Sequence, residues 1–171
     1  TRSDSEALRK ERAYAARRLG RFDLSLPIWQ ALAQEKSGSI EWVGAVVEDL
    51  QALGLGEEAL DTLDTLRKRH PQHVSLGFAA VRLAGVLKQK KRVRSLLKDL
   101  RRHVGADAMS MKNLALSYES IDEPIEALQV YRRLLRSTPN DQTSIRAVER
   151  LTQGEPEALP FPAFDLEEAR N

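Results

Sequence analysis

Hydrophobic residues recur along the chain at helical spacing. Between residues 43 and 50 the apolar positions are Val43, Val46, Val47 and Leu50, an i, i+3, i+4, i+7 spacing that places the side chains on one face of a helix. A second stripe of this kind covers residues 59–66. No run of alternating apolar and polar residues bounded by hairpin turns occurs in the sequence. The pattern therefore predicts an all-α protein built from amphipathic helices.

The helical stretches repeat with a period of about 34 residues. The turn between two stretches falls in equivalent places at Gly20, Gly54, Lys88 and Asp122. A large apolar residue then follows at Trp29, Leu63, Leu97 and Tyr131, and a leucine at Leu32, Leu66, Leu100 and Leu134. Small or modest residues, which let a neighbouring helix approach, recur at Ser25, Ala59, Val93 and Ala127. These sets indicate successive pairs of helices with the same packing.

Prolines and capping residues mark the expected helix ends. Asp122 is expected to cap the second helix of the fourth unit, with Pro124 in the first turn of that helix. Pro27, in the segment LSLPIWQAL, predicts that the second helix of the first unit starts late, because proline in a helix interior removes a backbone hydrogen bond. Pro71 and Pro139 are expected to end the second and fourth units.

This pattern resembles the tetratricopeptide repeat, a helix-turn-helix unit of about 34 residues with small residues at the helix contact and a proline near its end. The segments LGLGEEALDTLDTLRKRHP and SYESIDEPIEALQVYRRLLRSTPND carry the resemblance best. The resemblance implies a right-handed α-solenoid of antiparallel helix pairs, a superhelix like that of tetratricopeptide-repeat proteins. It covers about residues 6 to 140.

The resemblance and the period together predict the organisation of the chain. Residues 6–153 are expected to hold four repeats and a C-terminal capping helix, at about 6–39, 40–73, 74–107, 108–141 and then 141–153. A solenoid needs such a lid over its last exposed face, and Asp141 can cap this helix. Residues 1–5 are expected to form a disordered N-terminal segment, and residues 154–171 a proline-containing acidic tail or linker.

The composition is that of a soluble globular protein, with 42% hydrophobic and 30% charged residues. No run of about 18 apolar residues is present, so the sequence predicts no transmembrane segment. The absence of cysteine excludes disulfides and thiol catalysis, and leaves both a cytoplasmic and a periplasmic location open. The richness in Ala, Leu and Arg is typical of a bacterial protein.

No pattern in the sequence predicts catalysis. The histidines are His70, His73 and His103, and no cysteine or carboxylate cluster accompanies them to complete a metal site. We therefore expect no enzyme activity, no cofactor and no metal. Trp29 and Trp42, with Tyr131, fall at or near core spacing and are expected to be structural.

By resemblance, the first helix of each unit lines a concave groove that binds a peptide or protein segment. The expected partner-groove residues are Lys10, Tyr14, Arg17, Glu48, Phe78, Arg82, Lys112, Asn113 and Leu116. Small residues lie between them at Gly44, Ala45 and Ala79. The two-Lys, two-Asn, Arg clamp of chaperone-binding repeats is not matched, because Tyr14 and Ala45 stand where the asparagines are expected.

A basic segment, KQKKRVRSLLKDLRRH, fills residues 88–103 and holds eight Lys and Arg against one Asp, whereas the whole chain carries only +2. Its apolar positions 93, 96, 97, 100 and 104 share one helix face and predict a core side. The basic stripe around the other faces consists of Lys91, Arg94, Lys98, Arg101 and Arg102. This stripe is either a solvated outer face or a docking site for an acidic segment or an anionic polymer. Nucleic-acid binding is disfavoured, because aromatic residues are not interleaved and the total charge is small.

The main functional hypothesis is a non-catalytic scaffold within a larger bacterial protein or assembly, which binds a protein or peptide in its groove. One alternative is a periplasmic segment of an envelope or polysaccharide-export apparatus that engages an anionic polymer or a partner enzyme. Another is nucleic-acid binding through residues 88–103. The acidic tail, with Phe161 and Phe164 beside Asp165, is a candidate ligand for the basic stripe, and could form a homodimer by entering the groove of a second copy. The identity of the partner, the compartment, the pathway and the oligomeric state stay open at this point.

Overall fold

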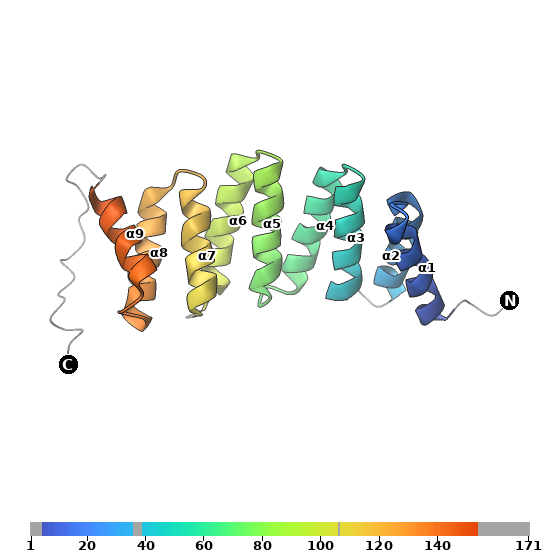
Figure 1. Cartoon of the computed structure of the whole chain (residues 1–171), viewed down its shortest axis with the longest axis horizontal. Coiled ribbons are helices and arrows are strands. Elements are labelled where there is room, and N and C mark those ends of the chain that lie inside the picture. The colour runs from blue at the N-terminus through green and yellow to red at the C-terminus, as the bar shows by residue number, and fades with distance from the viewer. Residues whose placement is uncertain (1–4, 36–38, 106, 154–171) are drawn as a thin grey trace. The chain divides into compact units, whose positions relative to one another are not determined.

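A computed structural model of the chain describes residues 5–35, 39–105 and 107–153 (Figure 1). Within these ranges the chain is all-α and forms no strand, so the predicted fold class is confirmed. The helices are α1 (Glu6–Arg18), α2 (Phe22–Glu35), α3 (Ile40–Ala52), α4 (Gly56–Arg69), α5 (Val74–Val86), α6 (Lys90–His103), α7 (Ala108–Glu119), α8 (Pro124–Ser137) and α9 (Gln142–Gln153). None of these described helices is both long and apolar enough to cross a membrane.

The starts of the helices keep the period of the sequence. The odd-numbered helices α1 to α9 start at Glu6, Ile40, Val74, Ala108 and Gln142, each one full repeat period after the one before. The even-numbered helices α2 to α8 start at Phe22, Gly56, Lys90 and Pro124, with the same constant spacing. The repeat is therefore a property of the backbone as well as of the side chains.

The turn inside each helix pair has the same backbone geometry four times. Its central residue has a positive φ: 68° at Gly20, 77° at Gly54, 57° at Lys88 and 63° at Asp122. The N–H of the following residue donates to a carbonyl five residues back, at 2.9 Å for Arg21 to Ala16, 2.8 Å for Leu55 to Leu50, 2.9 Å for Gln89 to Ala84 and 3.0 Å for Glu123 to Tyr118. This is the Schellman ending of a helix, in which a left-handed residue closes the last turn.

Asp122 is therefore not the cap of α8, and that expectation was wrong. Its left-handed backbone belongs to the end of α7, and Glu123 occupies the position before the first helical residue, Pro124. An aspartate is tolerated in either role, because its short polar side chain suits a helix cap and also lowers the cost of a positive φ.

The predicted late start of α2 was also wrong. The helix begins at Phe22 and runs through Pro27. The hydrogen bond that Pro27 cannot donate would have gone to the carbonyl of Asp23, which lies in the exposed first turn where water can replace the donor. Burial of Ser25 and Trp29 on the inner side of this helix favours the helical conformation despite the proline.

The chain divides into two compact units, Thr1–Leu96 and Leu97–Asn171, with the boundary inside α6. In the N-terminal unit α2 packs against α1 and α3, and α4 against α3 and α5. In the C-terminal unit α8 packs against α7 and α9. Each unit thus has a layer of first helices covered by a layer of second helices.

The predicted core positions are buried. The small-residue set Ser25, Ala59, Val93 and Ala127 has at most 2% of its surface exposed. The large-residue set and the leucine set are buried too, and they include Trp29, Leu63, Leu97, Tyr131, Leu32, Leu66, Leu100 and Leu134. Trp42 is 2% exposed, so the structural interpretation of the three large aromatic residues is confirmed.

Candidate functional site

Aromatic rings and one lysine connect α1, α2 and α3 in the N-terminal unit. Tyr14 meets Trp29 edge-on with ring centroids 5.1 Å apart, and Trp29 stacks on Trp42 at 5.7 Å. The Nζ atom of Lys10 lies 4.4 Å from the ring centroid of Trp42. Lys10 and Tyr14 were expected in the partner groove. Tyr14 packs on Trp29 within its own repeat, and Lys10 contacts Trp42 of the next repeat.

Arg17, another expected groove residue, is held by groups of α3. Its Nε donates to Asp49 Oδ1 at 2.6 Å, and its other nitrogens reach Glu48 Oε2 at 2.8 Å and the carbonyl of Ala45 at 2.5 Å. Asp49 is fully buried, and its second oxygen accepts from Ser25 Oγ at 2.5 Å. Arg17 thus neutralises a buried carboxylate, and its donors are already used inside the protein.

Two further groove cations have carboxylate partners of their own. Lys10 Nζ lies 3.7 Å from Glu41 Oε1. In the C-terminal unit Lys112 Nζ donates to Asp141 Oδ1 at 2.6 Å. Hydrogen bonds from Lys112 and Ser144 lower the pKa of Asp141 below its ordinary value. Because Lys10 and Lys112 pair with carboxylates of the protein itself, fewer groove cations are available to a partner than the sequence indicated.

The remaining expected groove residues divide between the two units. On α5 of the N-terminal unit, Phe78 is half-buried and Arg82, one turn later, is exposed. On α7 of the C-terminal unit, Asn113 and Leu116 are exposed. Tyr14 keeps 42% of its surface exposed although its ring packs on Trp29.

Two interfaces between successive first helices have an ion pair at the same repeat positions, and sequence reasoning missed it. Arg17 of α1 pairs with Glu48 of α3 at 2.8 Å, and Glu119 of α7 pairs with Arg150 of α9 at 2.6 Å. The two pairs occupy equivalent positions, because Glu119 and Arg150 lie three full repeats beyond Arg17 and Glu48, respectively. A search of the sequence for opposite charges at this constant separation would have found both pairs.

The equivalent positions between α3 and α5 hold Gln51 and Arg82. Gln51 occupies the position that Arg17 has at the α1–α3 interface and Glu119 has at the α7–α9 interface. Among the described residues, no carboxylate lies within ion-pair distance of Arg82. Arg82 thus occupies the position of Glu48 and Arg150, but the partner position holds no residue of opposite charge.

Known structures of similar shape identify the fold. Neither a protein-family model nor a curated protein sequence matches the chain. A solved structure of a tetratricopeptide repeat protein from Parabacteroides merdae superposes with a TM-score of 0.64 at 12% identity, covering 88% of this chain and 61% of that one. The chain has the tetratricopeptide-repeat fold. The predicted resemblance is therefore confirmed at the level of fold.

Structures of MamA share this tetratricopeptide-repeat architecture with the chain. One has a TM-score of 0.60 at 14% identity, covering 87% of this chain and 81% of that one. Another, from Desulfovibrio magneticus, has a TM-score of 0.56 at 15% identity, covering 90% of this chain and 96% of that one. Identities this low show a common fold and no more than that.

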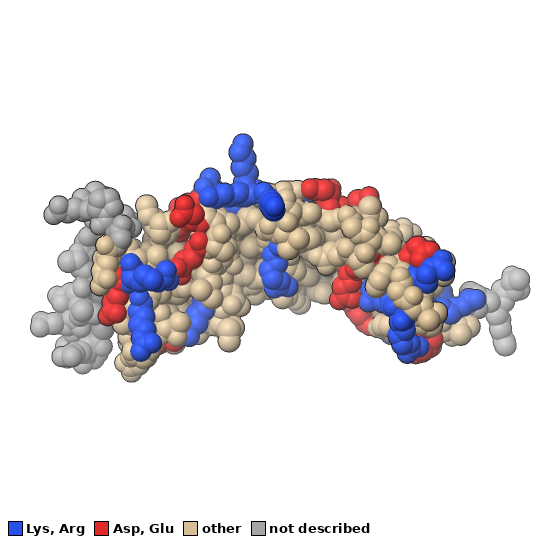
Figure 2. Space-filling model, turned by 45° about the horizontal axis from the view of Figure 1, so that its top comes forward, with Lys and Arg blue, Asp and Glu red and all other residues tan. Residues whose placement is uncertain are grey.

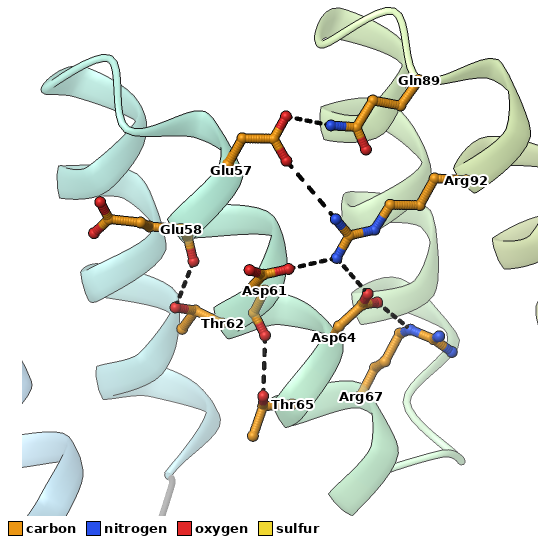
Figure 3. A network of polar contacts seen from close by, with 9 residues as sticks. All are labelled: Glu57, Glu58, Asp61, Thr62, Asp64, Thr65, Arg67, Gln89 and Arg92. Atoms are coloured by element: carbon orange, nitrogen blue, oxygen red, sulfur yellow. Dashed lines mark hydrogen bonds and ion pairs between the residues drawn. The ribbon is translucent and has the colours of Figure 1, made fainter.

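Between the second helices of the tetratricopeptide repeats, one arginine joins α6 to α4 (Figure 3). Arg92 donates to Asp61 Oδ1 and to Asp64 Oδ2, both at 2.7 Å, and lies 3.8 Å from Glu57 Oε2. Gln89 also donates to Glu57. The network uses the most acidic face of α4, so this part of the basic segment stabilises the stack of helices.

Asp64 is the partly buried centre of this network. Burial alone would raise its pKa, but hydrogen bonds from Arg67 and Arg92 outweigh burial and the pKa of Asp64 lies below its ordinary value. The carboxylate is thus held in its charged form by two guanidinium groups.

The basic stripe on α6 is only partly available. Lys91, Arg94, Lys98 and Arg102 are exposed, and Arg102 lies 3.9 Å from Asp99. Arg101 is half-buried and donates to Gln129 of α8 at 2.9 Å. The apolar residues of this segment are buried as predicted, so its structural role is confirmed.

Figure 2 shows how differently the charges are distributed over the surface. Red and blue side chains alternate at the end of the view where Figure 1 places α1 and α2. Blue side chains gather at the upper edge near the middle, where Figure 1 places the turn between α5 and α6. Lys88, Lys90 and Lys91 in this region are exposed, and within the described part of the chain they form no ion pair.

The histidines lie at helix ends. His70 follows α4 and His73 precedes α5, with ring centroids 5.9 Å apart. The Nδ1 atom of His103 lies 3.1 Å from the carbonyl of Asp99. The described residues contain no group of three or more His, Cys, Asp or Glu side chains suited to a metal. The acidic tail at 154–171 and the N-terminal residues 1–4 lie outside the described residues.

Proposed function

We propose that the chain is a non-catalytic scaffold that binds a peptide or protein segment on the face formed by its first helices. In the N-terminal unit these helices are α1, α3 and α5. The observation that carries the proposal is the contrast on this face: Lys10 and Arg17 are fixed by internal partners, whereas on α5 Phe78 is partly accessible and Arg82 is exposed. An aromatic residue and an arginine are the residue types that dominate binding energy at protein interfaces.

The small residues of α3 and α5 support the same surface. Gly44, one period before Phe78, lies in the middle of α3, and a Cβ atom added there would meet nothing within 4 Å. Glycine costs a helix interior about 1 kcal/mol relative to alanine, and no internal packing requires it here. Gly44 and Ala45 on α3 and Ala79 on α5 are small, so these first helices present little bulk that would exclude the side chains of a partner.

Capture of partners by the purified full chain tests this proposal. The double variant Phe78→Ala with Arg82→Ala is compared with the wild type in a lysate of the source cells, and bound proteins are quantified by mass spectrometry. The matched control changes one exposed apolar residue and one exposed cation on second helices of the same unit, Leu24→Ala with Lys68→Ala.

We expect the groove variant to lose specific partners that the control variant keeps. If both variants capture the same proteins in the same amounts as the wild type, the assignment of the interaction face to Phe78 and Arg82 is wrong.

A second candidate function is the binding of an anionic polymer, as in the periplasmic part of an envelope apparatus. The observation that favours it is the first turn of α6, which contains no acidic residue, whereas the first turns of α2, α4 and α8 do. The exposed cations Lys88, Lys90 and Lys91 add their charge to the positive end of this helix.

Titration of the full chain with polyglutamate and with single-stranded DNA, at low and high salt, tests this candidate. We expect binding to polyglutamate that weakens with salt and that is lost when Lys88, Lys90 and Lys91 are replaced by glutamine. Binding to DNA with a steep salt dependence would support the nucleic-acid alternative. Absence of binding to both polymers would remove this candidate function.

A further inference from the structure

We propose that Arg82 and Phe78 form a binding site for an acidic peptide segment in which a carboxylate side chain is adjacent to an apolar one. The carboxylate pairs with Arg82, and the apolar side chain packs on the ring of Phe78. This inference rests on the proposed function and specifies the chemistry of the ligand. It assigns the acidic ligand to the first helices, on a different helix from the basic stripe of α6.

The repeat pattern shows what is missing at Arg82. The equivalent interfaces satisfy their guanidinium groups internally, Arg17 with Glu48 at 2.8 Å and Arg150 with Glu119 at 2.6 Å. At the α3–α5 interface the partner position holds Gln51, which carries no charge. A carboxylate supplied by a ligand would restore the ion pair that the neighbouring interfaces build from their own residues.

Neighbouring charges favour a carboxylate at Arg82 over any other position on this face. Glu48, one period before Arg82, already has Arg17 as its partner, and Glu41 lies 3.7 Å from Lys10. The remaining charge on the α3–α5 surface is therefore that of Arg82. An arginine with an aromatic ring one turn away fits a carboxylate beside an apolar group, because each part of the ligand then has a complementary contact.

Shape supports the apolar half of this site. Gly44 on α3 occupies the repeat position of Phe78 on α5, and the space above it is open to 4 Å around the place of a Cβ. Gly85, one turn after Arg82, is equally open. Internal packing needs neither glycine, so a ligand backbone can approach α3 at Gly44 and α5 at Gly85 closely.

The probe is a fluorescent peptide with the sequence of residues 161–171, FPAFDLEEARN, in which Phe164 is adjacent to Asp165. A second peptide replaces its three acidic residues by Asn and Gln. Both are titrated against the full chain by fluorescence anisotropy. A full-length variant with Asp165→Asn, Glu167→Gln and Glu168→Gln is titrated in parallel, so that the acidic residues of the protein itself do not compete.

We expect the acidic peptide to bind, with an affinity that falls about tenfold for Arg82→Gln and for Phe78→Ala, and that falls with added salt. Lys68→Gln, which removes an exposed cation from a second helix, is the matched control and is expected to leave the affinity unchanged. The neutral peptide should bind the wild type no better than the acidic peptide binds Arg82→Gln.

Equal binding of the acidic and neutral peptides, no binding of either, or an acidic peptide that binds Arg82→Gln as well as the wild type would overturn the proposal. The lysate experiment distinguishes failure of the proposed interaction face from failure of the proposed acidic ligand. If the groove variant loses partners there but Arg82 does not select for the acidic peptide, the interaction face stands and the acidic ligand is wrong. If the groove variant also keeps all partners, both proposals fail.

Discussion

Arg17 of α1 donates to Asp49 of α3 at 2.6 Å, and the carboxylate of Asp49 is fully buried. A buried carboxylate is costly unless its charge and its lone pairs are satisfied, and here Arg17 and Ser25 do both. The contact joins the first helices of two successive repeats through an interior polar group. Its contribution to stability can be measured, because removal of Asp49 takes away the buried partner of the Arg17 guanidinium and leaves it only Glu48 and the carbonyl of Ala45.

We therefore predict that Asp49→Ala lowers the unfolding free energy of the N-terminal unit by about 3 kcal/mol. The chain has two tryptophans, Trp29 and Trp42, and both lie in this unit, so urea unfolding followed by tryptophan fluorescence reports on it directly. Glu48→Gln is the control, because Glu48 also contacts Arg17 but its side chain is 69% exposed. That variant should change the stability by less than about 1 kcal/mol. A loss of similar size in both variants would contradict the role given to burial.

The left-handed turn residues predict a stabilising substitution. Lys88 has a φ of 57°, a conformation that costs a residue with a Cβ more than it costs glycine. We expect Lys88→Gly to raise the unfolding free energy by about 0.5 to 1 kcal/mol. Lys91→Gly, inside α6, should lower it by about 1 kcal/mol. Urea unfolding of both variants measures the difference, and a destabilised Lys88→Gly variant would show that the lysine side chain makes a contact worth more than the strain.

Gly44 gives a prediction that separates stability from binding. Because a Cβ at this position meets nothing within 4 Å, Gly44→Ala should stabilise α3 by about 0.5 to 1 kcal/mol. Gly44→Leu should also fold, but its side chain would fill the open space on α3 at the repeat position of Phe78 and weaken the binding of the acidic peptide. Thermal unfolding and peptide anisotropy measure the two effects. A Gly44→Leu variant that binds the peptide like the wild type would place the ligand elsewhere.

The Asp64 network predicts how stability depends on pH. Although burial opposes it, hydrogen bonding to Arg67 and Arg92 lowers the pKa of Asp64 in the folded state. The resulting stabilisation is present above the ordinary aspartate pKa of about 3.9 and is lost as the pH falls through the lowered folded-state value. We expect the urea midpoint to drop below about pH 4, and the drop to be smaller in Asp64→Asn. Glu58→Gln, on an exposed part of α4, is the control and should keep the wild-type profile.

Much of the fold could be predicted from the sequence because the core obeys a strict period. Residues such as Ala59, Leu63 and Leu66 are spaced by the geometry of a single helix, so their burial follows from local spacing. Pro27 and Asp122 were misread for other reasons. The effect of Pro27 depends on whether water reaches the carbonyl that it leaves without a donor, and the local sequence does not show this. The left-handed turn at Asp122 was visible in the repeat, because Gly20 and Gly54 hold the equivalent position.

The candidate site was harder to predict. Lys10, Arg17 and Lys112 were expected to face a ligand, but whether a long cation reaches a carboxylate of the next repeat depends on the distance between helices. Phe78 and Arg82 were already among the groove candidates in the sequence, and the structure adds that the cations Lys10, Arg17 and Lys112 have internal partners. Residue type and repeat position identified the possible groove residues. The ion pairs seen in the structure then showed which of these residues have internal partners.

The signs of the charges are reversed between the Arg17–Glu48 pair and the equivalent Glu119–Arg150 pair. This reversal makes the first-helix contact near one end of the chain different from the contact near the other end. In a protein of similar repeats, a helix could dock against the wrong neighbour, either within one chain or between two chains during folding. If α9 took the place of α3 beside α1, Arg150 would face Arg17 and two cations would repel each other. If α3 took the place of α9 beside α7, Glu48 would face Glu119. The same two positions thus stabilise the correct order of helices and penalise its permutation.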